Sequence, residues 1–205
     1  MAPAITGLTG LTLETAPEVC QSCVWWQSHS DRGTSKRRWI ERAEGEWGPW
    51  GSVYHDDDGR VLGSMQYGPA ELFPRSFELP AGPPSDDAVI VTCAYLVDPG
   101  TPWVMQSLFL AAIGEARDKG AGALETFGYR YPEGESAYER FLVHRTIFPR
   151  DFLADFGFRT VRTAGRVELV RLDLGGLQPV VEGTRAKVLR VVKEAFQPAP
   201  VPQRP

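Results

Sequence analysis

The sequence predicts a single α/β (α+β) domain with a mixed central sheet of about six to seven strands flanked by helices. Residues Ala88–Val97 are apolar and β-branched nearly throughout, which indicates a central strand covered on both faces. A helical stretch and a second apolar strand, Ala123–Phe127, follow with short connections, as in neighbouring parallel strands. Hairpin patterns at 53–67 and 161–174 add antiparallel strands, so the sheet is predicted to be mixed.

Composition agrees with one compact domain and disfavours several classes of protein. The chain has 205 residues, 42% of them hydrophobic, which suits a single core. We assign 1–197 to the domain and expect the proline-rich tail 198–205 to be disordered. A net charge of −4 disfavours nucleic-acid binding, and no apolar run or signal sequence points to a membrane or to secretion. We therefore expect a cytoplasmic protein.

The N-terminal quarter is predicted to hold a short strand and two helices. Leu11–Leu13 alternates like a strand, and Pro17 suits the first turn of a helix that carries the segment 24–26. From Ser35 to Trp47 apolar side chains recur at helical spacing, with charged residues on the other face. This second segment is predicted to be an amphipathic helix.

A hairpin and a long loop are predicted next. Val53–His55 and Val61–Tyr67 flank the Asp-Asp-Asp-Gly turn at 56–59, and we favour exposed turn residues there over a metal site. Residues 68–86 include five prolines, at a spacing that no helix or central strand accepts. We expect this stretch to be a structured loop, and long loops in compact domains are often functional.

The second half adds helices and a final hairpin. Apolar residues of 109–116 line a helix that ends at Gly120, and Pro149–Gly157 has the start and stop signals of a short helix. Val161–Thr163 and Val167–Leu174 are predicted to pair as a hairpin, and a last helix is expected over 188–196.

The three cysteines leave two interpretations open. Cys20 and Cys23 have the spacing of a metal knuckle or a redox motif, and Cys93 or His29 could complete a site. A structural zinc site needs about four ligands, usually from a second such pair, and the sequence has none. We therefore favour free thiols and no metal.

Five phrases, in this order, resemble the GNAT superfamily of acyl-CoA-dependent N-acetyltransferases, especially bacterial members that open with a Cys-x-x-Cys-Val-x-Trp phrase. The resemblance covers about 11–174. Its carriers are Cys20–Trp26, Gly63–Pro69, Phe73–Arg75, Asp87–Val97 and Phe152–Phe158.

The resemblance implies acetyl-CoA as co-substrate, lying across the end of the central strand. The strand backbone would pair with the pantetheine arm, and the next loop and helix start would hold the pyrophosphate. Unpaired N–H groups and the macrodipole at a helix start favour an anion there. The residues that the resemblance assigns to acetyl-CoA are Tyr95, Leu96, Val97, Trp103, Val104, Met105, Gln106 and Ser107.

The chain departs from the family at two places. Trp103 and Met105 stand where the family's phosphate loop has glycine or another small residue, which lets backbone amides approach phosphate closely. Their side chains could point away and leave the amides available, or they could close the site. Leu153 stands where many members have a tyrosine that protonates the departing thiolate.

Two residues are candidates for proton transfer. Glu125 lies in an apolar strand, where burial disfavours a charged carboxylate, and is a candidate base. The alternative is a carboxylate paired with an arginine such as Arg130. His144, just ahead of the short helix, could replace the missing acid, or it is a structural or surface histidine.

The acceptor side is placed by the resemblance alone. Tyr67, Phe73 and Arg75 would border an acceptor pocket, and Arg130 would face them across splayed strands. Several arginines of the final hairpin could meet the phosphates of coenzyme A, although a solvated strand face explains them better.

The leading hypothesis is an N-acetyltransferase that moves acetyl from acetyl-CoA to an amine by direct attack in a ternary complex. The acceptor is a small molecule or a protein lysine, with no nucleic acid or membrane partner, and a homodimer is allowed. One alternative is a catalytically impaired GNAT-like binding or regulatory protein, which Trp103, Met105 and Leu153 favour. The other is a zinc-stabilised interaction module built on Cys20 and Cys23.

Overall fold

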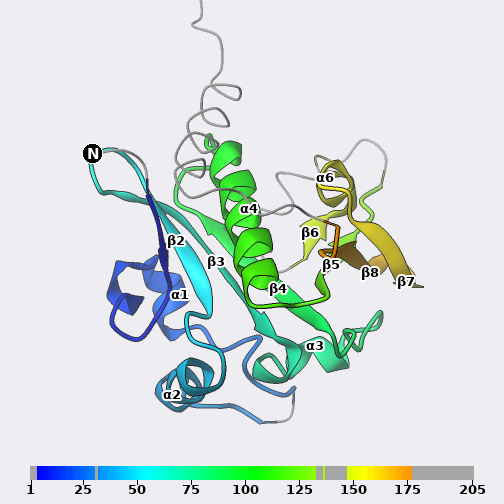
Figure 1. The fold of residues 1–205 in the computed structure, drawn as a ribbon, viewed down its shortest axis with the longest axis horizontal. Helices are drawn as coiled ribbons and strands as arrows, with labels where there is room; N and C mark the ends of the chain where they lie inside the picture. Colours follow the sequence, from blue (N-terminus) through cyan, green and yellow to red (C-terminus); the bar gives the residue numbers. More distant parts are fainter. Residues whose placement is uncertain (1–3, 31, 133–135, 137–146, 177–205) are drawn as a thin grey trace, which may run out of the picture.

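The protein is described from a computed structural model that covers residues 4–30, 32–132, 136 and 147–176. One eight-stranded sheet has the order β1-β2-β3-β4-β5-β8-β7, with β6 on β5 (Figure 1). The strands are β1 Ala4–Gly7, β2 Gly51–His55, β3 Val61–Pro69, β4 Ala88–Leu96, β5 Ala123–Tyr129, β6 Phe148–Pro149, β7 Arg159–Ala164 and β8 Val167–Asp173. β4 and β6 run parallel to β5, and the other pairs are antiparallel. The predicted mixed sheet is confirmed, with one strand more than the sequence indicated.

Helices cover both faces of this sheet (Figure 1). Alternate side chains of β4 point to opposite layers: Val89 and Val91 join the core under α4, and Ile90 joins the core under α2. The helices and 3-10 turns are η1 Leu13–Thr15, α1 Glu18–Ser22, α2 Lys36–Glu46, η2 Ala70–Leu72, α3 Arg75–Glu78, α4 Pro102–Asp118 and α6 Arg150–Asp155. Both layers are aromatic, so β4 and β5 are buried as a central parallel pair should be.

Several predicted elements are confirmed by the structure. α2 and the β2–β3 hairpin lie where the hydrophobic pattern placed them, and α4 connects the parallel strands β4 and β5. The loop predicted at 68–86 is confirmed in part: residues 70–87 connect β3 to β4, but Gly68 and Pro69 belong to β3, and the connection contains η2 and the short helix α3, which starts after Pro74. α6 ends before Gly157, whose φ of +84° suits glycine. The expected helix at 188–196 and the tail 198–205 lie outside the described residues.

The strand predicted at 11–13 and the extent of the first predicted helix are wrong. The edge strand is β1, which pairs with β2, whereas Leu11 is 92% exposed beside a Thr9–Thr12 turn whose hydroxyls bond nearby backbone groups. α1 ends at Ser22, before the tryptophans, because Trp26 turns into the core and stacks on Phe127 at 6.1 Å. Local alternation and helical spacing could not reveal these tertiary contacts.

Candidate active site

The central parallel strands β4 and β5 pair only over their first halves. Ala88–Val91 of β4 is in register with Ala123–Thr126 of β5, after which β5 continues against β8 and β4 continues against β3. The β3–β4 register skips Thr92, so a bulge lies where the two strands part. The Thr126 hydroxyl donates to the Val91 carbonyl at 2.8 Å and caps the last shared position. The sheet therefore opens between β4 and β5.

The opening is bounded on one side by the end of β4, where the cofactor arm is predicted. Leu96 is buried under α4, and the half-exposed Val97 donates its N–H to the Leu62 carbonyl at 2.9 Å. Tyr95 lies opposite Ser64 of β3 and its side chain keeps some exposure. On the other side, β6 pairs with β5 beyond the region that β4 has left. Tyr95 and Leu96 thus belong to the bulged, separated half of β4.

The start of α4 faces this same end of β4, because only residues 97–101 connect them. Trp103 and Met105 pack into the core between α4 and the sheet, Trp103 edge-on against Tyr54 at 5.2 Å. Their side chains therefore turn away from the helix start, the first of the two orientations considered above. Val104 and Ser107 are also buried, and the Ser107 hydroxyl donates to the Trp103 carbonyl at 2.9 Å.

Two polar groups distinguish the α4 start. The Asp98 carboxylate accepts the Gly100 N–H at 2.8 Å, so an acidic side chain occupies the loop that leads into the helix. Within the described part of the chain, the buried Oε1 of Gln106 has no hydrogen-bond partner. A buried acceptor without a donor costs about 1–3 kcal/mol, so a ligand N–H would be favourable there. The first group repels an anionic ligand and the second attracts a ligand donor.

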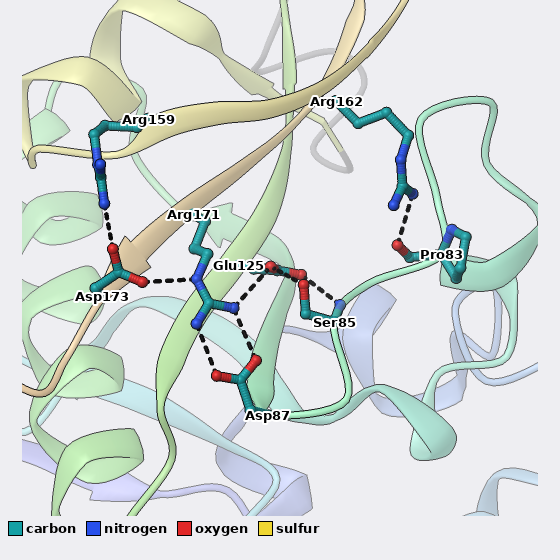
Figure 2. Close-up of polar contacts among 8 residues, drawn as sticks. All are labelled: Pro83, Ser85, Asp87, Glu125, Arg159, Arg162, Arg171 and Asp173. Carbon is teal, nitrogen blue, oxygen red and sulfur yellow. Dashed lines mark hydrogen bonds and ion pairs between the residues drawn. The ribbon is translucent and has the colours of Figure 1, made fainter.

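Glu125 lies on β5 at the paired end, opposite Ile90, with its side chain fully buried (Figure 2). Its carboxylate accepts from the Ser85 N–H at 2.8 Å, the Ser85 hydroxyl at 2.7 Å and Arg171 at 3.3 Å. The arginine partner is therefore Arg171 of β8, whereas Arg130 pairs with Glu168. Glu125 is therefore held by protein donors in the part of the sheet where β4 and β5 are still paired.

Arg171 is the centre of that network. It binds Asp87 through two parallel contacts of 2.8 and 2.7 Å and donates to Asp173 at 2.7 Å (Figure 2). These hydrogen bonds lower the pKa values of Asp87 and Asp173 and raise that of Arg171. Arg159 pairs with Asp173, and Arg162 donates to the Pro83 carbonyl at 2.9 Å. Three of the final-hairpin arginines therefore tie β7 and β8 to one another and to the loop before β4.

The chain resembles several solved structures over most of its length. Ard1 from Thermoplasma volcanium is 12% identical, with 87% of this chain and 100% of that chain covered and a TM-score of 0.47. A GCN5-related N-acetyltransferase from Kribbella flavida is 17% identical, with coverages of 84% and 98% and a TM-score of 0.44. The ribosomal-protein-S18-alanine N-acetyltransferase from Escherichia coli is 12% identical, with coverages of 86% and 96% and a TM-score of 0.43.

Further solved structures that resemble most of the chain include an acetyltransferase of the GNAT family from Desulfovibrio desulfuricans, which is 14% identical, with coverages of 85% and 100% and a TM-score of 0.48. The likeness at these identities concerns the fold alone. No protein-family model matches the chain, and no curated protein matches it.

The predicted acceptor residues do not share one pocket in this GNAT-like fold. Tyr67 is buried on the α4 side, with Ser52 at 2.6 Å and Glu115 at 2.5 Å from its hydroxyl. Phe73 is buried in the opposite layer, under α2. The sheet itself therefore separates these two side chains.

Arg75 and Arg130 both hold structure in place. Arg75 donates to the carbonyls of Trp25 at 3.0 Å and His29 at 3.2 Å, and so fixes the connection between α1 and α2. Arg130 pairs with the buried Glu168 of β8. Burial opposes the charge on Glu168, but hydrogen bonds from Thr160 and the charge of Arg130 outweigh it and lower its pKa.

The remaining predictions concern thiols and the proton donor. His144 lies outside the described residues, and Leu153 is fully buried in the core under α4. Cys20, Cys23 and Cys93 are free thiols, and in the parts of the chain that are described no three His, Cys, Asp or Glu side chains converge as metal ligands.

Of the described helices, none combines the length and apolarity needed to cross a membrane.

Sequence reasoning missed the polar groups on the α2 side of the sheet. Lys36 lies over the rings of Trp39 and Trp50, 5.0 and 4.8 Å from their centroids, and donates to the Cys23 carbonyl at 2.9 Å. Desolvation lowers its pKa. Gln27 donates to Gln66 of β3 at 2.6 Å. No local motif marks these residues, although the i, i+4 arginines on α2 described below are visible in the sequence.

Proposed function

We propose that the protein is an N-acetyltransferase that transfers acetyl from acetyl-CoA to an amine within a ternary complex. The observation that carries this proposal is the parting of β4 and β5 after Val91, at a bulge, with the start of α4 at the same end. A separated strand edge offers backbone groups to an extended amide-containing chain, and a helix start offers N–H groups to phosphate. Acetyl-CoA contains both chemical parts.

The residues of the opening fit such a substrate. The separated half of β4, with Tyr95 and Leu96, would lie along the pantetheine arm, and the buried Oε1 of Gln106 would accept one of its amide N–H groups. Because Trp103 and Met105 are packed inward, they leave the α4 start to the pyrophosphate.

The reaction balances without a redox partner. The amine nitrogen attacks the thioester carbonyl carbon, a C–N bond forms, and the C–S bond breaks. The amine loses a proton and the sulfur gains one. Holding thioester and amine together accounts for much of the rate in such a reaction. We assign Glu125 to positioning of β5 and β8, because three protein donors enclose it, and keep His144 as the proposed acid.

Asp98 favours the second candidate, a GNAT-like protein that binds another ligand and has lost acetyl-CoA turnover. Its carboxylate takes an amide of the loop in which the pyrophosphate would lie, and its charge repels phosphate. The two candidates differ in a measurable way, because only the enzyme releases free thiol.

The test is a calorimetric titration with acetyl-CoA, followed by a thiol-release assay over a panel of amines. Micromolar binding with turnover supports the enzyme, and no binding at millimolar acetyl-CoA rejects it. Asp98→Asn should tighten binding severalfold by removing a like charge while keeping an acceptor for Gly100. Asp118→Asn is the matched control, because Asp118 is at the other end of α4. Equal effects of the two variants would argue against phosphate at the α4 start.

A further inference from the structure

A pocket of about 370 Å³ lies on the α2 side of the sheet, opposite α4. The connection between α1 and α2 forms one wall, α2 forms another, and Pro74 closes an end. Arg75, the neighbour of Pro74, holds the first wall through its bonds to the Trp25 and His29 carbonyls. The volume suits a small molecule.

The pocket is cationic although the chain is acidic. Its lining includes Arg32, Arg38 and Arg42, and none of its lining residues, all from the described part of the chain, is acidic. Arg38 and Arg42 are one turn apart on α2, where like charges cost a helix roughly 0.2–0.5 kcal/mol. Among the described acids, Glu46 is 4.0 Å from Arg42, at the rim of the pocket, where both side chains are about half exposed. The pocket therefore attracts an anion.

Gln27 adds a second requirement. It lines the pocket, is 4% exposed, and donates its amide N–H to Gln66, while its own Oε1 is buried with no partner among the described residues. The indole of Trp39 gives an apolar wall, with its N–H already donated to the Leu72 carbonyl at 2.6 Å. A ligand that satisfies the pocket carries both an anionic group and an N–H or O–H donor.

Two contacts connect the pocket wall to the strands around the opening between β4 and β5. Gln66, the partner of Gln27, is opposite Cys93, two positions beyond Val91 on the separated half of β4. Trp26, next to Gln27 in the chain, stacks on Phe127 of β5, also beyond the last shared pair. Residues 26 and 27 therefore contact β5 and β3, the two strands that flank β4, at the level where β4 leaves β5.

We propose that this pocket binds the acceptor of the acetyl transfer, and that the acceptor is an amine that also bears a carboxylate, as a free amino acid does. This inference rests on the proposed function. The carboxylate meets Arg38 and Arg42, and the amine lies toward Gln27 and the opening. Polyamines and aminoglycosides, which are polycations, are disfavoured by the same arginines.

The test measures binding without acetyl-CoA. Free amino acids, their α-carboxamides and spermidine are titrated calorimetrically into the full chain. Amino acids should bind, and the carboxamides and spermidine should bind at least tenfold more weakly. Arg38→Gln should weaken amino-acid binding about tenfold or more, as loss of a charge-assisted hydrogen bond does. Arg37→Gln is the matched control on the same helix, because Arg37 is 88% exposed and pairs only with Glu41 in the described structure.

Three results separate the possibilities. Equal binding of amino acids and their carboxamides, or an Arg38→Gln variant that binds amino acids as well as Arg37→Gln does, overturns the proposal that the pocket binds a carboxylate. Acetylation of neutral amines at a rate that Arg38→Gln leaves unchanged overturns the inference and leaves the acetyltransferase proposal standing. Binding of amino acids that depends on Arg38, with no thiol release, rejects the proposed function and with it the acceptor role. Gln27→Met, which removes the buried acceptor together with the donor to Gln66, should weaken amino-acid binding and also lower the unfolding temperature, and binding equal to that of Arg37→Gln would overturn the need for a ligand donor.

Discussion

Replacing Arg171 with methionine should destabilise the fold through Glu125. The contacts of Arg171 with Asp87 and Asp173 involve half-exposed carboxylates, 57% and 48% exposed, and such pairs contribute about 0–1 kcal/mol each. Glu125 is 0% exposed, and removing one partner of a buried pair costs roughly 3–5 kcal/mol. Ser85 still donates two hydrogen bonds to Glu125. We therefore expect a loss at the lower end, about 3 kcal/mol.

Urea unfolding followed by circular dichroism measures this loss, and a double-mutant cycle assigns it. Arg159→Met, which removes only an exposed pair with Asp173, should cost less than about 1 kcal/mol. Combining Arg171→Met with Glu125→Gln should recover much of the stability, because no buried charge remains unpaired. A coupling energy below about 0.5 kcal/mol between positions 125 and 171 would refute the reasoning.

Three further predictions follow from packing and charge. Trp103→Gly should lower the free energy of unfolding by at least about 3 kcal/mol without tightening acetyl-CoA binding, because the indole is packed in the core. Tighter acetyl-CoA binding by calorimetry would instead show that the indole obstructs the site. The pKa of Glu168 is lowered in the folded state, so its stabilisation is present above the ordinary glutamate value of about 4.5 and is lost as pH falls through the folded value. Urea midpoints between pH 7 and 3 should therefore fall more steeply for the wild type than for Glu168→Gln, and parallel curves would contradict this. Desolvation raises the pKa of the Cys93 thiol to about 12, so iodoacetamide at pH 8 should modify the exposed Cys23 in the native protein and Cys93 only after unfolding. Peptide mass spectrometry measures the modification of each cysteine, and alkylation of Cys93 in the native protein would contradict the prediction.

The sequence was most informative where periodicity and burial agree. β4 is apolar throughout because both faces are covered, and α4 connects it to β5, so the parallel pair could be predicted without tertiary information. The β2–β3 hairpin was predictable because its turn chemistry is local. β1 was not, because an edge strand of four residues is specified by its partner β2 rather than by its own pattern.

The candidate site was less predictable because side-chain partners come from distant positions. Glu125 was expected to act as a base or to pair with an arginine such as Arg130. Its partners in the structure are Ser85 and Arg171, 40 and 46 positions away. Tyr67 and Phe73 are close in sequence, yet the sheet lies between them. The pocket on α2 depends on a connection that Arg75 and Glu78, more than 40 positions away, help to hold through hydrogen bonds to residues 25–30.

Hydrogen–deuterium exchange with and without acetyl-CoA tests the central claim most directly, because it reports on the backbone of the opening itself. The account predicts that saturating acetyl-CoA slows exchange in residues 92–97 and at the α4 start, 100–104, and leaves the turn at 119–122, which follows the opposite end of α4, unchanged. Unchanged exchange at both segments with millimolar acetyl-CoA present would contradict the account.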